Sequence, residues 1–160
     1  MRIRFFWTLA CLAVTFALAA QATQAAPGDA PLACNSGEEA RLQITVRGVR
    51  SAKGAITIML YDDRDEVFLK KAGRIARIRA PAQKGVVNAC LAVPRPGSYA
   101  VSLYHDEDAN RKLTKNWVGM PTEGYGFSRD AAVSYRLPQL DEAVFTALPG
   151  DNRVDIQIRY

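Results

Sequence analysis

Residues 154–160 read VDIQIRY, the clearest alternation of apolar and polar side chains in the chain. Val154, Ile156 and Ile158 are apolar, and polar side chains stand between them. This two-residue period is typical of a strand with one buried face, whereas a helix repeats its apolar positions every three or four residues. The chain is therefore expected to end in a β-strand that packs against a core.

Six further stretches have the composition or the alternation of short strands. They are residues 42–47, 56–61, 75–78, 87–93, 99–105 and 144–148. Turn sequences rich in Gly, Pro, Asp and Asn separate several of them. The turn SAKG at residues 51–54 predicts that the first two strands form a hairpin. The arginines around residues 75–78 predict a strand at a sheet edge, where charge discourages pairing with other chains.

Seven short strands, without a long helical period and without alternating strands and helices, predict an all-β fold. The expected architecture is an antiparallel β-sandwich of about seven strands, immunoglobulin-like or transthyretin-like, with one long loop from Asp106 to Pro138. Residues 41–160 have the length of a single domain that buries roughly 68% of its unfolded surface. Residues 62–71 break the strand period, so they form either one helical turn or a loop that packs into the core.

The first 25 residues have the features of a cleaved signal peptide. Arg2 and Arg4 precede an unbroken apolar run over residues 5–20, and small residues follow it. An uncleaved membrane anchor is the alternative, but the run is short for a spanning helix. We therefore expect a periplasmic or secreted protein with no transmembrane segment in its mature chain. Residues 26–40, which lack any period, are expected to form an N-terminal arm.

Export changes the interpretation of the cysteines. Cys11 leaves with the leader, so Cys34 and Cys90 remain as an even pair in an oxidising compartment, which predicts a disulfide between them. Two unpaired thiols are the alternative, and no C-x-x-C spacing indicates a redox site. Chain entropy predicts that a bridge across such a long span stabilises the fold by roughly 4 kcal/mol.

The charge of the chain argues against a nucleic-acid partner. The formal charge of +5 falls by two when Arg2 and Arg4 leave, and the remaining Lys and Arg are scattered along predicted strands and turns. There is no long basic tract and no aromatic motif typical of RNA binding. We expect no nucleic acid to bind.

The longest stretch that core packing does not require is 105–128, HDEDANRKLTKNWVGMPTEGYGFS. Asp106, Asp108 and Asn110 stand at alternate positions, a spacing that turns three oxygen-bearing side chains toward one centre. Hard cations such as calcium require ligands of this kind. Glu123 adds another oxygen ligand if the loop folds back. One hypothesis is therefore a cation site at these four residues, with calcium as the cofactor.

This loop is not an EF-hand. Arg111 stands where that motif requires glycine, Trp117 stands where it requires a bidentate glutamate, and flanking helices are absent. The alternative to a metal site is that the Asp and Asn side chains form turns by hydrogen bonding to the backbone. Both interpretations stay open at this point.

Aromatic side chains in and beside the loop raise a second hypothesis. Tyr104, Trp117 and Tyr125 would form a platform for sugar rings if all three faced solvent. The partner would then be an envelope glycan or another envelope protein. Capping of the hydrophobic core is the alternative role for such aromatic residues.

The sequence does not support an enzyme. His105 is the only histidine, and its parity places it with the inward-facing Tyr99, Val101 and Leu103, so we expect a buried structural histidine. There is no G-x-S-x-G, no H-E-x-x-H and no glycine-rich phosphate loop. A hydrolase with Asp106 and Glu123 as its acids is only a distant third hypothesis.

A longer set of residues resembles a known family. The set comprises Gly97-Ser98-Tyr99-Ala100, His105-Asp106, Asp108, Asn110, Lys112-Leu113, Asn116, Gly119, Pro121, Glu123 and Gly126-Phe127-Ser128. It resembles the bacterial family called domain of unknown function 2141, over residues 42–160. The resemblance implies an exported, β-rich protein without an established activity. It also implies a loop signature, comprising His105, Gly119, Pro121, Tyr125, Gly126, Phe127 and Ser128.

The resemblance also implies glycines that this chain lacks. Family members often carry glycine after the loop's amide residue, and Ala109 and Arg111 stand at the corresponding positions here. The leading hypothesis is an exported, non-enzymatic β-sandwich protein whose acidic loop binds a cation or forms a recognition surface. The alternative is a cell-envelope module that binds carbohydrate or peptidoglycan.

Overall fold

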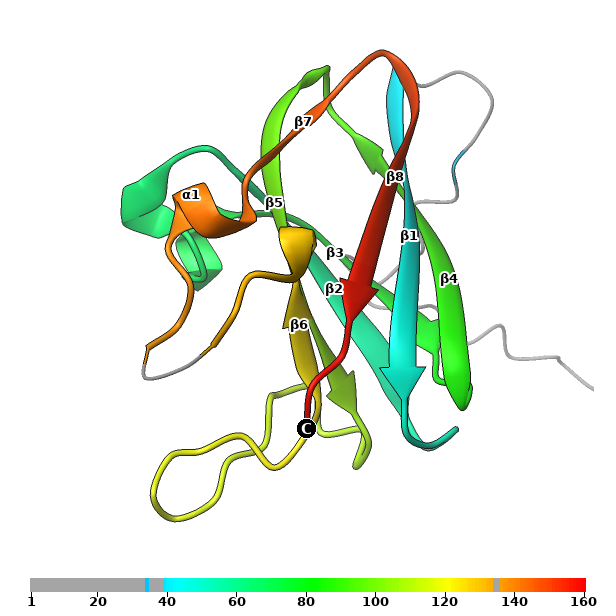
Figure 1. Cartoon of the computed structure of the whole chain (residues 1–160), viewed down its shortest axis with the longest axis vertical. Helices are drawn as coiled ribbons and strands as arrows, with labels where there is room; N and C mark the ends of the chain where they lie inside the picture. Colours follow the sequence, from blue (N-terminus) through cyan, green and yellow to red (C-terminus); the bar gives the residue numbers. More distant parts are fainter. Residues whose placement is uncertain (1–33, 35–38, 134–135) are drawn as a thin grey trace, which may run out of the picture.

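The structure is a computed structural model that describes residue 34, residues 39–133 and residues 136–160. The expected signal peptide and most of the expected arm lie outside the described residues. The described chain forms eight strands in two sheets with one four-residue α-helix, so the predicted β-sandwich class is confirmed. Figure 1 shows the two layers, with the long loop at the lower end of the sandwich.

The smaller sheet has the order β4-β1-β8. These strands are β1 (Ala40–Val49), β4 (Gly85–Val93) and β8 (Gly150–Gln157). β1 pairs antiparallel with β4 and parallel with β8, so the expected antiparallel sandwich contains one parallel pair. The alternation predicted for the final strand is confirmed, because Val154 and Ile156 are buried and the polar residues beside them are exposed.

The larger sheet has the order β3-β2-β5-β6, and β7 pairs with the other end of β5. These strands are β3 (Arg74–Pro81), β2 (Ala55–Asp62), β5 (Gly97–Asp106), β6 (Tyr125–Phe127) and β7 (Phe145–Ala147). β3 lies at an edge of this sheet, as its arginines predicted.

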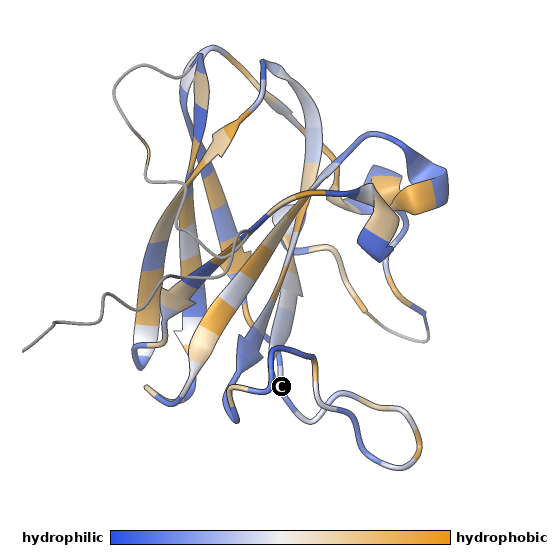
Figure 2. Ribbon diagram, turned by 180° about the vertical axis from the view of Figure 1, so that it is seen from behind, coloured by the Kyte–Doolittle hydropathy of each residue, from blue (hydrophilic) through white to orange (hydrophobic). Residues whose placement is uncertain are grey.

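The main core fills the space between the two sheets. Each sheet contributes the apolar members of its alternating strands, and the apolar and polar bands along the strands are visible in Figure 2. The residues at most 1% exposed include Leu42, Ile44, Val46, Ile56, Ile58, Leu60, Leu91, Val101 and Ile156. Because each buried Val, Leu or Ile side chain stabilises the fold by about 1.5–3 kcal/mol, this layer is the main source of stability.

A second apolar cluster covers the opposite face of the larger sheet. Tyr61 and Ala100 belong to it, and they neighbour core residues on the same strands, so they point to the other face. The other buried members lie in β6, beside three 3-10 turns and in the α-helix. These turns are η1 (Asp65–Val67), η2 (Lys71–Gly73) and η3 (Ser128–Asp130), and the helix is α1 (Leu140–Ala143). β5 is thus buried on both faces, which its sequence alternation alone did not predict.

The second cluster resolves the question left open for residues 62–71. That stretch forms two short 3-10 turns, and Phe68 between them is 8% exposed. The Phe68 ring meets Tyr61 edge-on, with 5.5 Å between ring centroids. The stretch is therefore both helical in its turns and packed against the sheet.

Two sequence predictions are corrected by the topology. The first two strands do not form a hairpin, because β1 lies in the smaller sheet and β2 in the larger one. The long loop from Asp106 to Pro138 is not continuous, since β6 interrupts it and pairs with β5. For β1 and β2 the alternation located the buried side chains correctly but contained no information on which strands pair. The three-residue strand β6 was not predicted.

The disulfide between Cys34 and Cys90 is present, with a Cα–Cα distance of 5.7 Å. It ties residue 34 to β4, as predicted from the cysteine count. Among the described residues, no helix combines the length and the apolar character needed to cross a membrane.

Candidate cation site

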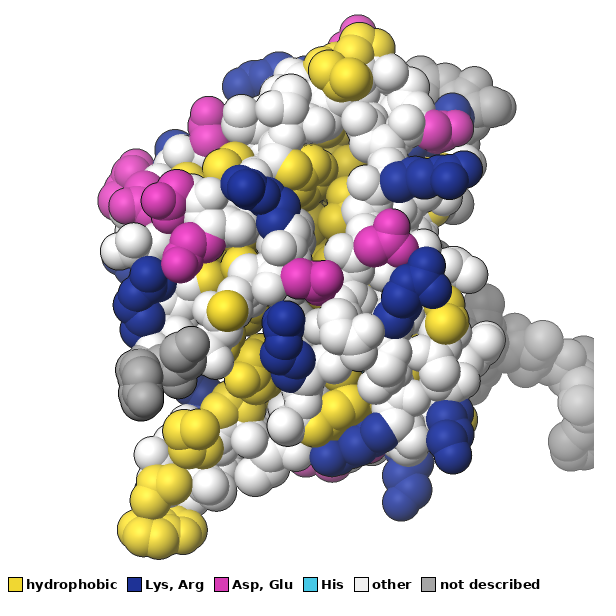
Figure 3. All heavy atoms as spheres, viewed as in Figure 1, with side chains coloured by type: hydrophobic (Ala, Val, Ile, Leu, Met, Phe, Trp, Pro, Cys, Tyr) yellow, Lys and Arg dark blue, Asp and Glu magenta, His cyan; other side chains and the backbone are white. Residues whose placement is uncertain are grey.

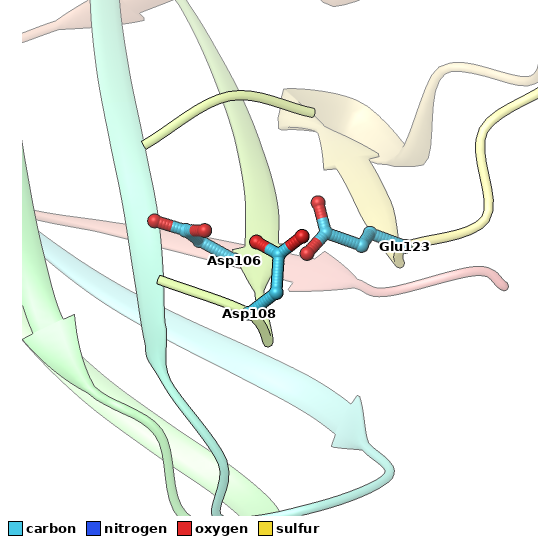
Figure 4. Close-up of side chains that lie close together, drawn as sticks. All are labelled: Asp106, Asp108 and Glu123. Carbon is cyan, nitrogen blue, oxygen red and sulfur yellow. The ribbon is translucent and has the colours of Figure 1, made fainter. Parts of the chain in front are cut away.

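Three carboxylates converge where the long loop leaves and rejoins the larger sheet. Asp106 is the last residue of β5, Asp108 follows it in the loop, and Glu123 precedes β6, which pairs back onto β5. Each contributes a carboxylate oxygen, and these oxygens lie within 4.8 Å of one another (Figure 4). Asp106 is 0% exposed and Glu123 is 5% exposed, whereas Asp108 faces solvent. We call these three residues the acidic triad.

Asp106 has one satisfied and one unsatisfied oxygen. Its Oδ2 accepts hydrogen bonds from Arg79 Nη2 at 2.7 Å and from the Arg111 backbone N–H at 3.0 Å. Its Oδ1 is buried and accepts no hydrogen bond. A buried carboxylate oxygen without a partner costs about 1–3 kcal/mol, more when the group is charged. The site therefore has a free, electron-rich position that a cation would fill.

Glu123 joins the two halves of the loop. Its Oε1 accepts the backbone N–H of Glu107, and its Oε2 accepts the backbone N–H of Thr114, both at 2.9 Å. A carboxylate that accepts backbone N–H groups from two places fixes both segments relative to itself. Glu123 therefore sets the shape of the loop as well as its charge.

The turn interpretation is correct for part of the loop. Asp108 Oδ1 accepts the N–H of Asn110, and Asn110 Oδ1 accepts the N–H of Lys112. These are successive turns between a side chain and the backbone two residues later. The Asn110 amide group also donates to Asp108 Oδ2 at 2.7 Å. The Asn110 oxygen is thus engaged in the turn, and the acidic triad forms beside it.

The backbone at the glycine-like positions matches the family resemblance. Ala109 and Arg111 adopt φ values of 59° and 64°. Glycine reaches this left-handed region freely, whereas other residues pay about 1–2 kcal/mol for it. The loop therefore keeps the conformation that glycine would favour, although the chain has larger residues there.

The triad carries concentrated negative charge. Arg79 offsets part of it through the 2.7 Å ion pair with Asp106. Like charges within about 5 Å repel one another, and a cation placed between them would offset that repulsion. The sequence located Asp106, Asp108 and Glu123, but it contained no signal that Arg79 would reach them.

A separate polar network surrounds His105. The His105 side chain is 0% exposed, as expected for a structural histidine. Its Nε2 lies 2.8 Å from the carbonyl oxygen of Lys53, which can only accept, so Nε2 donates. In the neutral ring Nδ1 then accepts the hydroxyl of Tyr160 at 2.8 Å. Both ring nitrogens are engaged, so His105 holds the chain end in place.

Glu107 belongs to this network and not to the triad. Arg50 binds both of its carboxylate oxygens, and Ser51 Oγ donates to Oε1 at 2.8 Å. Chiefly through the Arg50 hydrogen bonds, the pKa of Glu107 is lowered to about 2. The Arg50 guanidinium also lies over the Tyr160 ring, 4.2 Å from its centroid. Sequence analysis missed the pairing of Glu107 with Arg50.

The three aromatic residues proposed as a sugar platform do not share one exposed face. Tyr104 is 6% exposed, and its hydroxyl accepts a hydrogen bond from Arg77 Nη2 at 3.0 Å. Tyr125 is half-buried and packs against the second apolar cluster. Trp117 is 95% exposed at the far end of the loop. The expected platform is therefore corrected to a single open ring.

The remaining signature residues build the return path of the loop. Gly119 and Pro121 lie in its outer turn, where Pro121 forms an isolated bridge with Lys115. Gly126 and Phe127 pair with β5 opposite Leu103 and Ser102. Their common function is to bring Glu123 back to Asp106.

Ser128 completes this path with three hydrogen bonds. It is 0% exposed, its Oγ accepts the N–H of Val101 at 2.9 Å, and its single hydroxyl proton is shared between the carbonyls of Ala143 at 2.5 Å and Val101 at 3.3 Å. Ser128→Ala leaves a buried N–H without its partner, which is expected to lower the free energy of unfolding by about 2 kcal/mol. Urea unfolding measures this. The half-buried Ser98 provides the control, and an equal loss in Ser98→Ala and Ser128→Ala would contradict the role of Ser128.

A groove lies away from the triad, at the other end of β5. It has a volume of about 420 Å³ and includes Asp63, Asp65, Asp141 and Leu140 in its lining. Among the described residues, the acidic triad brings three metal-ligating side chains together, and no such group lines this groove. The groove therefore does not compete with the loop as the chemical site.

Together these features define a small disulfide-linked β-sandwich whose long loop carries an acidic triad. Residues 44–157 match the family described as "Uncharacterized protein conserved in bacteria (DUF2141)", and the chain belongs to this family. The resemblance derived from the loop residues is thereby confirmed. No curated protein and no solved structure matches the chain.

Proposed function

We propose that this protein is an exported, non-enzymatic binding protein whose long loop holds a calcium ion at Asp106, Asp108 and Glu123. One observation carries the proposal. The Asp106 side chain is fully buried, its Oδ1 accepts no hydrogen bond, and its carboxylate lies within 4.8 Å of the other two. Burying such a carboxylate without a partner is unfavourable, and a bound cation removes that cost.

The donor set favours a hard divalent cation. All three side chains offer oxygen, which calcium prefers, with six to eight ligands at flexible geometry. Metals that prefer nitrogen or sulfur are disfavoured, because both nitrogens of His105 are engaged and Cys34 and Cys90 are paired. Magnesium demands a stricter octahedron, so calcium is the better match for a loop whose ligands come from three separate positions.

The non-enzymatic and exported parts of the proposal rest on other observations. A buried His105 with both nitrogens hydrogen-bonded has no proton to exchange with a substrate, which supports a binding role. The Cys34–Cys90 disulfide supports an oxidising compartment. The apolar run after Arg2 and Arg4 supports the same location, the periplasm or the exterior.

Unfolding in calcium and in chelator tests the cation site. At a free calcium concentration one hundred times the dissociation constant, a specific site adds about 2.7 kcal/mol to the free energy of unfolding. Asp108→Asn is expected to abolish the shift. This variant removes one ligand charge at an exposed position, so the fold itself is preserved. Direct calcium titration by calorimetry should show the same loss of binding.

Glu107→Gln provides the matched control. It removes a charge from between two triad members, but that charge is paired with Arg50, so calcium binding should persist. Equal stability in calcium and chelator would contradict the site. The site would also be contradicted if the calcium-dependent gain in stability persisted in Asp108→Asn and disappeared in Glu107→Gln.

A further inference from the structure

The outer part of the long loop is a hydrogen-bonded hairpin, residues 114–122, which we call the finger. Its two arms are joined by the Lys115–Pro121 bridge and by the Thr122 N–H, which donates to the Thr114 carbonyl at 2.9 Å. The Asn116 N–H donates to the Met120 carbonyl at 2.8 Å. Because the arms are paired, the finger projects from the sandwich as a formed element.

The turn at the end of the finger is held by one side chain. Asn116 Oδ1 accepts the N–H groups of Val118 at 3.1 Å and Met120 at 2.9 Å. The Gly119 N–H donates to the Asn116 carbonyl at 3.0 Å. These bonds satisfy the N–H groups of Val118, Gly119 and Met120 inside the turn, so these three donors can leave water without losing hydrogen bonds.

The side chains at the tip are apolar and open to solvent. Trp117 is 95% exposed, Val118 is 56% exposed and Met120 is 60% exposed. Figure 3 shows apolar side chains at the end of the projecting loop. Scattered exposed apolar residues are ordinary, but a contiguous group on a protruding turn marks an interaction surface.

Positive charge accompanies the apolar tip. Residues 111–122 contain Arg111, Lys112 and Lys115 and no aspartate or glutamate. Lys112 and Lys115 are exposed, and neither ammonium group pairs with a carboxylate among the described residues. The surface that receives the tip is therefore expected to be negative.

We propose that the finger inserts its tip into the headgroup region of an anionic lipid bilayer. A protruding tip cannot enclose a small ligand, whereas it can enter a soft apolar layer. Tryptophan is enriched at the boundary between lipid and water, and lysines beside an anionic leaflet strengthen binding. The other large apolar side chains exposed in the same turn are Val118 and Met120, which suit a lipid layer better than a sugar.

Vesicle binding by residues 26–160 tests the proposal. This stretch contains every described element, both apolar clusters and the disulfide, and it omits the apolar run that would bind lipid by itself. The chain has two tryptophans, and Trp117 is the one in this stretch, so its emission reports on the tip alone. Chelator is present throughout, so the outcome is independent of the cation site.

With vesicles of phosphatidylcholine and phosphatidylglycerol, Trp117 emission should shift to shorter wavelength and be quenched by brominated acyl chains. Pure phosphatidylcholine vesicles should bind far less. In sedimentation with the mixed vesicles, Trp117→Ala should lose binding. The Lys112→Ala/Lys115→Ala variant should bind roughly twenty-five-fold more weakly, because each lysine near an anionic surface contributes about fivefold.

Matched controls alter the same chemistry elsewhere. Leu148→Ala removes an exposed apolar side chain, and Lys70→Ala/Lys71→Ala removes two exposed charges, so neither should change binding. The proposal is overturned if no emission shift occurs with anionic vesicles, or if these controls lose as much binding as the finger variants. It is also overturned if the shift occurs without lipid and rises with protein concentration, which indicates a second copy. The proposal is likewise overturned if Trp117 emission shifts with peptidoglycan fragments and does not shift with vesicles.

Discussion

Gly54→Ala is expected to lower the free energy of unfolding by more than about 3 kcal/mol, a large effect for one methyl group. Gly54 has φ +67°, and an added Cβ would lie 1.8 Å from the carbonyl oxygen of Asp106. The obstacle is backbone, which cannot rotate away as a side chain can. The start of the acidic loop would therefore have to move, together with the last residue of β5.

Gly119→Ala separates the steric part of this effect from backbone strain. Gly119 also has a positive φ, +84°, but nothing lies within 4 Å of the position of its Cβ. Its substitution should therefore cost only the left-handed strain, about 1 kcal/mol. Urea unfolding of both variants measures the difference. Equal losses would show that the contact with Asp106 does not matter.

Loss of the disulfide is expected to lower the free energy of unfolding by about 4 kcal/mol. Cys34 and Cys90 are 56 positions apart, and the bridge restricts the unfolded chain over this whole span. Without it, the unfolded state gains conformational entropy and residue 34 is no longer tied to β4. Denaturant unfolding of the oxidised protein, the reduced protein and the Cys34→Ser/Cys90→Ser variant measures the loss.

The double variant is also the control for the reductant. Reduction should shift the unfolding midpoint of the unaltered protein and leave that of the double variant unchanged. If reduction left the midpoint of the unaltered protein in place, the bridge would contribute nothing to stability. A shift in both proteins would instead identify a general effect of the reductant.

The strands were predictable because burial of one strand face produces a local alternation of apolar and polar residues. Leu42, Ile44 and Val46 alternate with polar residues, and all three are buried in the core between the sheets. The choice of pairing partner produces no such local pattern. The turn at residues 51–54 resembles a hairpin turn, yet it carries the chain from one sheet to the other. An alternating strand looks the same whichever neighbour it pairs with.

The acidic site was partly predictable for the same reason. Asp106 and Asp108 are close in the sequence, so their spacing indicated a shared centre. Glu123 required the loop to fold back, which depends on the pairing of β6 with β5. Arg79 reaches Asp106 from an edge strand through a contact that no local pattern encodes. The sequence identified Trp117 as an aromatic residue of the loop. It did not show that Tyr104 is buried and that Trp117 is exposed without it.

The sequence by itself determined the all-β class, the paired cysteines, the buried histidine and the stretch that carries the site, because each depends on side-chain chemistry or on local periodicity. Only the tertiary structure decided that β1 runs parallel to β8 and that Glu107 pairs with Arg50 rather than with the triad. It also left Asp106 Oδ1 buried without a partner. These features depend on distances between residues far apart in the chain, which form only when both sheets close around one core.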